Sequence, residues 1–153
     1  MEDDELMENS EQDTQADTQA DETTEQGTQT EQTTEDTTTD IEDVLIGLLE
    51  SLNYPVYRQG SFSADDQYPE SFFTFWNNDS ADHSHYDNDN YGTDWNFSVN
   101  FYSEDPALTY SVIADTRILL KQNDWIVPSK GYDINSDADS HTGRGLTVFY
   151  LET

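Results

Sequence analysis

Hydrophobic positions divide the chain into a polar first segment and a patterned remainder. Residues 1–40 contain no aromatic side chain, whereas residues 41–52 carry isoleucine, valine and leucine at helical spacing. Asp40, a good N-cap residue, stands directly before this pattern. Residues 105–122 repeat the helical spacing, with Pro106 at the first helical position. The pattern therefore predicts two amphipathic helices in the second part of the chain.

Runs of aromatic and β-branched residues predict the strands. They lie at residues 54–58, 71–76, 94–102, 125–127 and 146–151. Polar residues at 77–94 and 131–145 predict long connections between them. The order is helix, three strands, helix, two strands. This order predicts an α+β domain in which two helices pack on one face of a mainly antiparallel sheet.

The clearest alternation lies within residues 94–102. Large apolar side chains occupy one face of this predicted strand, namely Trp95, Phe97, Val99 and Phe101. Small polar side chains occupy the other face, namely Asn96, Ser98 and Asn100. A strand with this pattern buries one face, so we expect the polar face, including Asn96 and Asn100, to meet water or a partner.

Composition separates the two parts of the chain further. Residues 1–40 hold 15 acidic residues, 11 threonines and no lysine or arginine. Such a segment cannot bury enough apolar surface to offset the entropy of ordering it. We therefore expect a disordered acidic tail at 1–40. The remaining residues, 41–153, suffice for one domain with a single core.

Charge excludes several classes of function. The chain has 34 acidic and 5 basic residues, a net charge of −29, so nucleic-acid binding by phosphate neutralisation is not expected. The chain has no cysteine, so it has neither disulfides nor thiolate metal ligands. Its longest mostly apolar stretch, Val44–Leu49, is too short to span a membrane. The acidic start is unlike a secretory signal peptide, so we do not expect export.

The Asp- and His-rich residues 79–94 are the first candidate for a metal site. Asp87, Asp89 and Gly92 match the first, third and sixth positions of a calcium-binding loop. Tyr91 replaces the oxygen ligand at the fifth position, and Ser98 stands where a bidentate glutamate is required. The pattern therefore favours a solvated loop, with Asp87 and Asp89 as weak cation ligands.

Histidines and serines form no recognisable catalytic motif. A three-histidine zinc site would need His83, His85 and His141, which nothing in the sequence brings together. The chain has no Gly-x-Ser-x-Gly elbow, the usual position of a hydrolase nucleophile. We therefore expect no catalytic residue, no cofactor and no enzymatic activity.

The glycine-flanked run His141-Thr142-Gly143-Arg144-Gly145 lacks the Gly-Lys-Ser/Thr ending of a phosphate-binding loop. It predicts a turn in which glycines allow positive φ. Arg144 is then expected to pair with a nearby acid such as Asp137 or Asp139, or with an acid of a neighbouring subunit.

Several motifs in residues 41–153 resemble those of small structural proteins from tailed phages and prophages. They are Tyr54-Pro55-Val56-Tyr57, the run from Tyr68 to Asn77, Tyr86-Asp87-Asn88, the run from Trp95 to Pro106, Leu119-Leu120-Lys121, and the segment from Gly131 to Gly145. The domain resembles in particular the tail terminator, or tail completion, proteins of long-tailed siphophages. Asn123-Asp124 departs from the pattern, because a glycine is expected after the second helix.

The resemblance implies a structural virion protein at the head–tail junction, assembled in the host cytoplasm. Its subunits are expected to form a ring, a hexamer, that caps the tail tube protein and joins the head–tail connector protein. DNA would pass only as cargo. Contacts with partners are expected from His141, Arg144, Asn96 and Asn100. The alternatives are another connector or tail-tube subunit, or a cation-dependent glycan-binding module.

Overall fold

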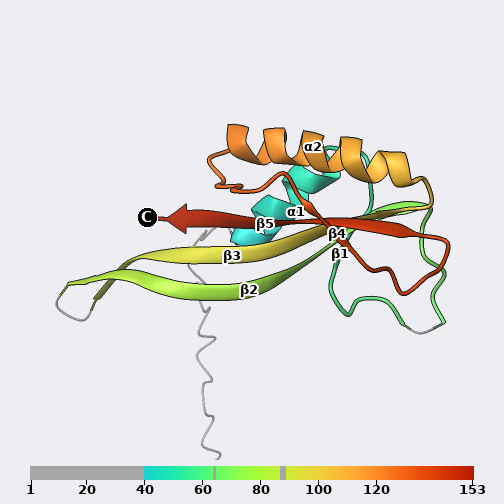
Figure 1. The fold of residues 1–153 in the computed structure, drawn as a ribbon. Helices are drawn as coiled ribbons and strands as arrows, with labels where there is room; N and C mark the ends of the chain where they lie inside the picture. The colour runs from blue at the N-terminus through green and yellow to red at the C-terminus, as the bar shows by residue number, and fades with distance from the viewer. Residues whose placement is uncertain (1–39, 64, 87–88) are drawn as a thin grey trace, which may run out of the picture. The chain divides into compact units, whose positions relative to one another are not determined.

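The computed structural model describes residues 40–63, 65–86 and 89–153. The tail predicted at residues 1–40 lies outside the described residues except for Asp40. Within them, two helices and five strands follow one another along the chain (Figure 1). They are α1 (Ile41–Glu50), β1 (Val56–Arg58), β2 (Ser71–Tyr86), β3 (Asp89–Ser103), α2 (Pro106–Gln122), β4 (Tyr132–Ile134) and β5 (Thr142–Glu152).

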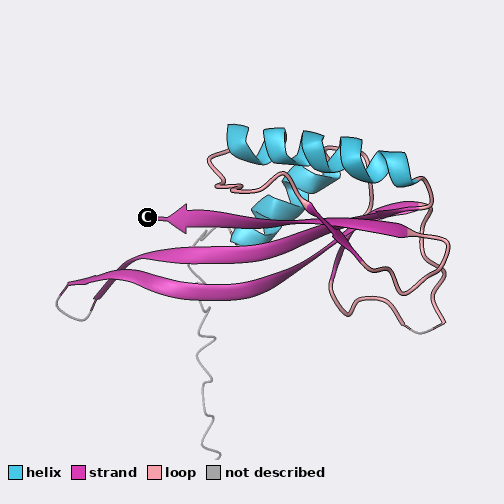
Figure 2. Cartoon of the chain, in the orientation of Figure 1, coloured by secondary structure: helices cyan, strands magenta, loops and turns pink. Residues whose placement is uncertain are grey.

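The strands form one sheet in the order β1-β2-β3-β5-β4. β1 pairs parallel with β2, and the other three pairings are antiparallel. Both helices lie on the same face of this sheet (Figure 2). The predicted α+β class with a mainly antiparallel sheet is therefore confirmed.

Each helix begins where a side chain caps the free backbone N–H groups of its first turn. The Asp40 carboxylate accepts a hydrogen bond of 2.9 Å from the Glu42 N–H at the start of α1. Asp105 accepts one of 2.9 Å from the Ala107 N–H at the start of α2, beside Pro106. These two caps confirm the predicted helix starts.

The core fills the space between the helices and the sheet. Alternate residues of the strands meet the apolar faces of both helices there. Phe73 of β2 and Phe101 of β3 contact each other with ring centroids 4.8 Å apart. The fully buried members of this core include Leu45, Leu49, Phe73, Phe97, Val99, Phe101, Ile113, Leu120, Leu146 and Val148.

The predicted loop at 77–94 is wrong. β2 and β3 continue through this segment as a long antiparallel hairpin, in which Ala81 pairs with Asp94 and His83 pairs with Gly92. Figure 1 shows this hairpin extending beyond the helices. A strand whose two faces both meet water needs no apolar alternation, because cross-strand hydrogen bonds hold it. The polar composition of residues 77–94 therefore gave no sign that the two strands continue.

The predictions for residues 125–145 are also corrected. Residues 125–127 form no strand, and Ile126 makes only an isolated bridge to Phe149. The connection predicted at 131–145 contains β4 and the start of β5. β4 has only three residues, so it leaves almost no periodic signal in the sequence.

Candidate functional site

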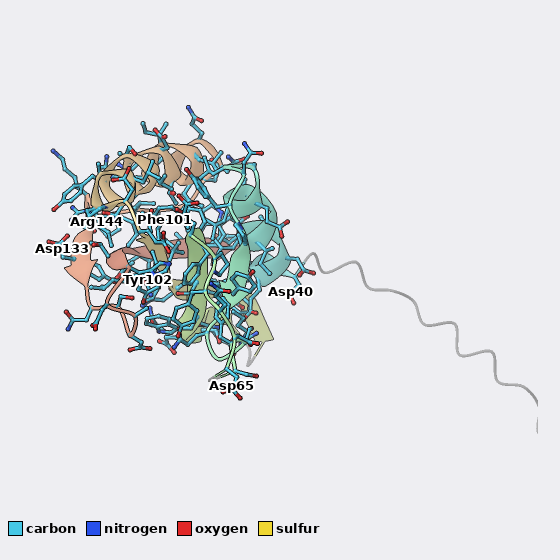
Figure 3. All side chains as sticks on the ribbon, turned by 90° about the vertical axis from the view of Figure 1, so that its right-hand side faces the viewer. Asp40, Asp65, Phe101, Tyr102, Asp133 and Arg144 are labelled. Atoms are coloured by element: carbon cyan, nitrogen blue, oxygen red, sulfur yellow. The ribbon has the colours of Figure 1, made fainter. Side chains whose placement is uncertain are left out.

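An aromatic cluster covers one end of the sheet face opposite the helices, here called the helix-free face. Its members are Tyr57, Phe62, Tyr68, Phe72, Tyr102 and His141. The Phe72 and Tyr102 rings stack with centroids 5.4 Å apart, and Phe62 packs edge-on to Phe72 at 5.3 Å. Figure 3 shows Phe101 and Tyr102, which are neighbours in sequence, on opposite sides of the sheet.

A hollow of about 320 Å³ lies against this cluster and is called the aromatic hollow. Its aromatic walls are Phe62, Tyr68, Phe72, Trp76 and Tyr102. Its polar lining is Arg58, Gln59, Thr74, Asn135, Ser136 and Asp137. These residues come from β1, β2, β3 and the loops on either side, so the sheet registers and two loops jointly shape the hollow. A flat or apolar group could pack against its rings while its polar atoms bond the rim.

Tyr102, in the lining of the hollow, has a raised proton affinity. Burial raises the pKa of its phenol above the usual value of 10.0, and the Asp137 carboxylate raises it further. The hydroxyl of Thr74 lowers the pKa in part. The phenol therefore stays protonated at neutral pH and can donate a hydrogen bond to a bound group.

Arg58 reaches the rim of the hollow from β1 and forms an ion pair with Glu42 of α1. Its side chain is 60% exposed, so it remains accessible to a ligand or a partner. Arg58 and Asp137 together give the hollow one cationic and one anionic group. These two charges suit a polar ligand rather than a purely apolar one.

His141, predicted as a partner contact, fastens two loops of the same chain. Its Nε2 lies 2.8 Å from the Pro69 carbonyl oxygen, and since a carbonyl only accepts, Nε2 donates. Its Nδ1 lies 2.8 Å from the Ser140 hydroxyl. The ring also packs edge-on against Tyr68 and Phe72. His141 therefore closes one end of the aromatic cluster.

Arg144, the other basic residue predicted to contact a partner, is held within the domain. Its Nη1 donates to the Asp133 carboxylate at 2.7 Å, and its Nη2 donates to the Gly131 carbonyl at 3.1 Å. The guanidinium also lies 4.3 Å from the centre of the Tyr110 ring. Its side chain is only 14% exposed. The structure therefore makes Arg144 a clamp between β5, β4 and α2.

The predicted partners of Arg144, Asp137 and Asp139, are wrong. The register of β4 and β5 places Asp133 directly opposite Arg144, so this acid, 11 residues earlier in the chain, makes the ion pair. Figure 3 shows the labelled pair on the same side of the domain. A strand register is a tertiary property, which sequence separation does not reveal.

Gly143 and Gly145 lie within β5 and not in a turn, so the predicted positive φ is wrong. Glycine is required at both positions because cross-strand neighbours occupy the space that a side chain would need. A Cβ at Gly143 would lie 2.7 Å from the Tyr102 ring, and a Cβ at Gly145 would collide with the Asn100 amide oxygen. The two glycines thus let Tyr102 and Asn100 lie flat on the helix-free face.

The predicted polar face of β3 is only partly open. Asn100 is 1% exposed and Ser98 is also buried, so the expectation that they meet water or a partner is wrong. The Asn100 amide lies over Gly145, next to the Tyr132 ring of β4. Asn96 is partly buried and accepts a hydrogen bond of 3.1 Å from Asn78. Only Asn96 of the predicted pair is therefore placed to touch a partner.

The described residues assemble neither of the two weak candidate metal sites. Asp87 lies outside the described residues, and Asp89 is described only through its backbone, which pairs with Tyr86. The following residues are extended in β3, unlike a calcium loop between helices. Among the described residues, no group of three or more acidic or histidine side chains could hold a metal ion.

The three-histidine arrangement also fails on distance. His83 pairs with Asp94 across the hairpin at 3.0 Å, near the far end of β2. His141 lies beside Pro69, just before β2 begins. At about 3.3 Å per residue, the intervening strand separates them by tens of ångströms. The side chain of His85 is not among those described.

No family model matches the chain, and no curated protein is significantly similar to it. In the described part of the chain, no helix is long and apolar enough to cross a membrane. The aromatic hollow leaves no motif in the sequence, because Trp76, Tyr102 and Asp137 are far apart along the chain. The alternating aromatics of β2, Phe72 and Trp76 among them, were its only signal.

Proposed function

We propose that this chain is a non-enzymatic structural subunit of a tailed-phage virion, of the tail-terminator type. In this proposal its copies close into a ring, a hexamer, at the head–tail junction, between the tail tube and the head connector. The motif resemblance motivates the proposal. The observation that carries it is a chemical difference between the two lateral sides of the domain.

The first lateral side, called the α1 side, consists of α1, β1 and the outer edge of β2. Its helix and cap carry four acids and no base, namely Asp40, Glu42, Asp43 and Glu50. Arg58 of β1 is paired with one of them. Among the described residues, no strand pairs with the outer edge of β2 between Trp76 and Ala81, since β1 ends opposite Phe75. This side is acidic and has an open strand edge.

The second side, called the α2 side, consists of α2 and β4. α2 and its cap carry Arg117 and Lys121 against Asp105 and Asp115, so the helix is neutral in a chain of charge −29. Asp133 of β4 is paired with Arg144. Large apolar side chains are also exposed here, namely Tyr110, Ile118 and Tyr132. Figure 3 shows α2 and Arg144 on one side of the domain and α1 and Asp40 on the other.

Two different and complementary sides on one subunit suit a head-to-tail contact. Such heterologous contacts close into rings when the rotation between subunits is a fraction of a full turn. Exposed aromatic and aliphatic groups supply the buried area, and the acids of the α1 side of one subunit can approach Arg117 and Lys121 of the next. The overall acidity also suits the passage of DNA, because an acidic lumen repels phosphate.

Oligomer size tests the ring and its interface together. We expect the full chain at micromolar concentration in 2 M KCl to give closed rings by light scattering and negative-stain electron microscopy. Ile118→Glu on the α2 side should give monomers, whereas Leu151→Glu at the end of β5 should keep the ring. The two residues are matched, since both are apolar and about half exposed, at 54% and 48%. A wild-type chain that is folded but monomeric would refute the proposal.

Localisation tests the place of the ring in the virion. An antibody to residues 1–40 should label the head–tail junction of particles that contain this chain. Label along the tube would instead identify a tube subunit. Label at the distal tip would favour a host-glycan role. Particles whose denatured proteins are also negative would exclude the virion assignment.

A second candidate function is recognition of a glycan in the aromatic hollow. The observation that favours it is the combination of aromatic walls with Arg58 and Asp137 at the rim. Sugar rings stack their C–H faces on aromatic side chains, and charged side chains bond their hydroxyl groups. Titration of the chain with oligosaccharides should then quench Trp76 fluorescence, and Trp76→Ala should abolish binding. Failure of a broad oligosaccharide panel to shift the melting temperature would exclude this role.

A further inference from the structure

The folded domain carries an unusual excess of unpaired negative charge. Residues 41–153 contain 19 acids and 5 bases, a net charge of −14 for the domain alone. A net charge of about 2–8 in magnitude is enough to keep a small domain soluble. The excess therefore does not come only from the tail at residues 1–40.

Few of these acids have a cationic partner among the described residues. Arginine pairs only with Glu42 and Asp133, and His83 contacts Asp94. Other acids are exposed and make no described hydrogen bond or ion pair through their side chains, among them Asp43, Glu50, Asp65, Asp79 and Asp115. Most of the negative charge on the folded surface is thus balanced only by ions from solution.

Local structure adds to this repulsion. Glu50 lies in the last turn of α1, where the helix dipole is already negative and no basic residue is present. Asp43 lies in the first turn of the same short helix, where the dipole favours a carboxylate, so it adds to the surface charge without this local penalty. Folding holds these carboxylates together, whereas unfolding separates them. At low ionic strength, repulsion therefore favours the unfolded chain.

The range of this repulsion depends on salt. The screening length is about 10 Å at 0.1 M salt, so neighbouring surface carboxylates still repel each other. It falls to about 3 Å at 1 M salt, which is shorter than most distances between exposed side chains. We propose that this domain requires salt of molar concentration for full stability, with cations screening its acidic surface as part of its native condition. The proposal concerns the monomer and does not depend on ring formation.

Thermal unfolding of the full chain in increasing KCl tests the requirement. We expect the melting temperature, followed by far-ultraviolet circular dichroism and by fluorescence of the buried Trp125, to rise by about 10 °C or more between 0.1 and 2 M KCl. NaCl should give the same rise, because screening does not distinguish the two cations. A melting temperature that changes by less than about 2 °C would overturn the proposal.

Salt can raise the melting temperature by screening charges or by strengthening the burial of apolar surface. Variants with altered charge distinguish these two effects. The variant Asp43→Asn, Glu50→Gln, Asp65→Asn, Asp79→Asn, Asp115→Asn removes five charges and no described hydrogen bond. It should melt higher than wild type at 0.1 M KCl and show a smaller rise with salt. The opposite variant, Gln59→Glu, Gln67→Glu, adds two charges at exposed positions and should show a larger rise than wild type. Equal salt dependence in all three proteins would overturn the proposal, since the effect would then not arise from charge.

Guanidinium chloride and urea offer an independent check. Guanidinium chloride is a salt, so its first few tenths molar should raise the melting temperature of the chain by screening. Urea is uncharged and should lower it from the first addition. An immediate decrease in both denaturants would contradict the screening requirement. Whether copies also associate is measured separately, so a monomeric chain with strong salt dependence would refute the ring and retain this inference.

Discussion

The two faces of the sheet are built by different means. The helix-covered face buries alternating large apolar side chains, such as Phe73, Phe101 and Leu146, against two amphipathic helices. The helix-free face combines glycine, aromatic rings and polar groups, such as Gly143, Tyr102 and Asn100. The stability of the helix-covered face comes from the amount of apolar area that it buries. The packing of the helix-free face is set by which residues lie opposite each other across the strands.

This difference bears on function. A face closed by helices has no room for a partner, but the helix-free face keeps the aromatic hollow and the extended hairpin open. The lateral sides next to it differ in charge. The surfaces available for recognition are therefore the helix-free face and the lateral sides, which no other element of the domain covers completely. Substitutions on each face test this difference.

We expect the largest loss of stability from a substitution in the core of the helix-covered face. Phe101→Ala removes a fully buried ring that contacts Phe73 and Tyr54, and should lower the free energy of unfolding by about 3–5 kcal/mol. Urea unfolding in 2 M KCl measures it. A loss below about 1 kcal/mol would show that this face does not contain the main core.

The next effect tests the close cross-strand packing of the helix-free face. Gly143→Ala would place a Cβ 2.7 Å from both Ile134 and the Tyr102 ring, and should cost about 1–3 kcal/mol of stability. The control is Gly47→Ala on the exposed side of α1, where a Cβ meets nothing within 4 Å. The control should stabilise the domain by about 0.5–1 kcal/mol, because alanine favours a helix. Equal effects of the two substitutions would contradict the packing described for β5.

Two arginines compare the buried clamp with an exposed pair. Arg144→Met removes the bonds to Asp133 and Gly131 and should cost about 1–2 kcal/mol, since the side chain is 14% exposed. Arg58→Met removes a pair whose arginine is 60% exposed and should cost less than about 1 kcal/mol. Chemical denaturation of both variants under the same conditions gives the comparison. A greater loss for Arg58→Met would reverse our assignment of the structural arginine.

We expect the smallest change in stability from Tyr102, and only at alkaline pH. Because the pKa of Tyr102 is raised above 10.0 in the folded domain, the unfolded chain loses its phenolic proton first. Stability should therefore fall as the pH rises above 10.0 and through the folded pKa, and be unaffected by this group at lower pH. Tyr102→Phe should reduce the fall, as measured by urea unfolding between pH 8 and 11. An unchanged pH profile would show that Tyr102 is not the group responsible.

Local signals in the sequence predicted the helices and the central strand correctly. Asp40 and Asp105 cap the helices they precede, and the alternation of Phe97, Val99 and Phe101 identified the buried face of β3. These signals are reliable because a cap and a periodic face each depend on residues within a few positions of one another.

Long-range pairing explains the predictions that failed. The hairpin of β2 and β3 extends through polar residues, and β4 is too short to show a pattern. The partner of Arg144 and the burial of Asn100 follow from the registers of β5 with its two neighbours. No window of sequence contains both members of such a pair, so these features could not be predicted from it.

Local sequence patterns specify the α+β class, the two capped helices, the buried face of the sheet and the strong acidity of the domain. The use of the other residues depends on the tertiary fold. Folding brings Trp76, Tyr102 and Asp137 together in one hollow, and it places the acidic α1 and the neutral α2 on opposite sides of the domain. The physical reason is that periodicity and charge are properties of the chain, whereas strand register and helix placement arise when the whole core packs.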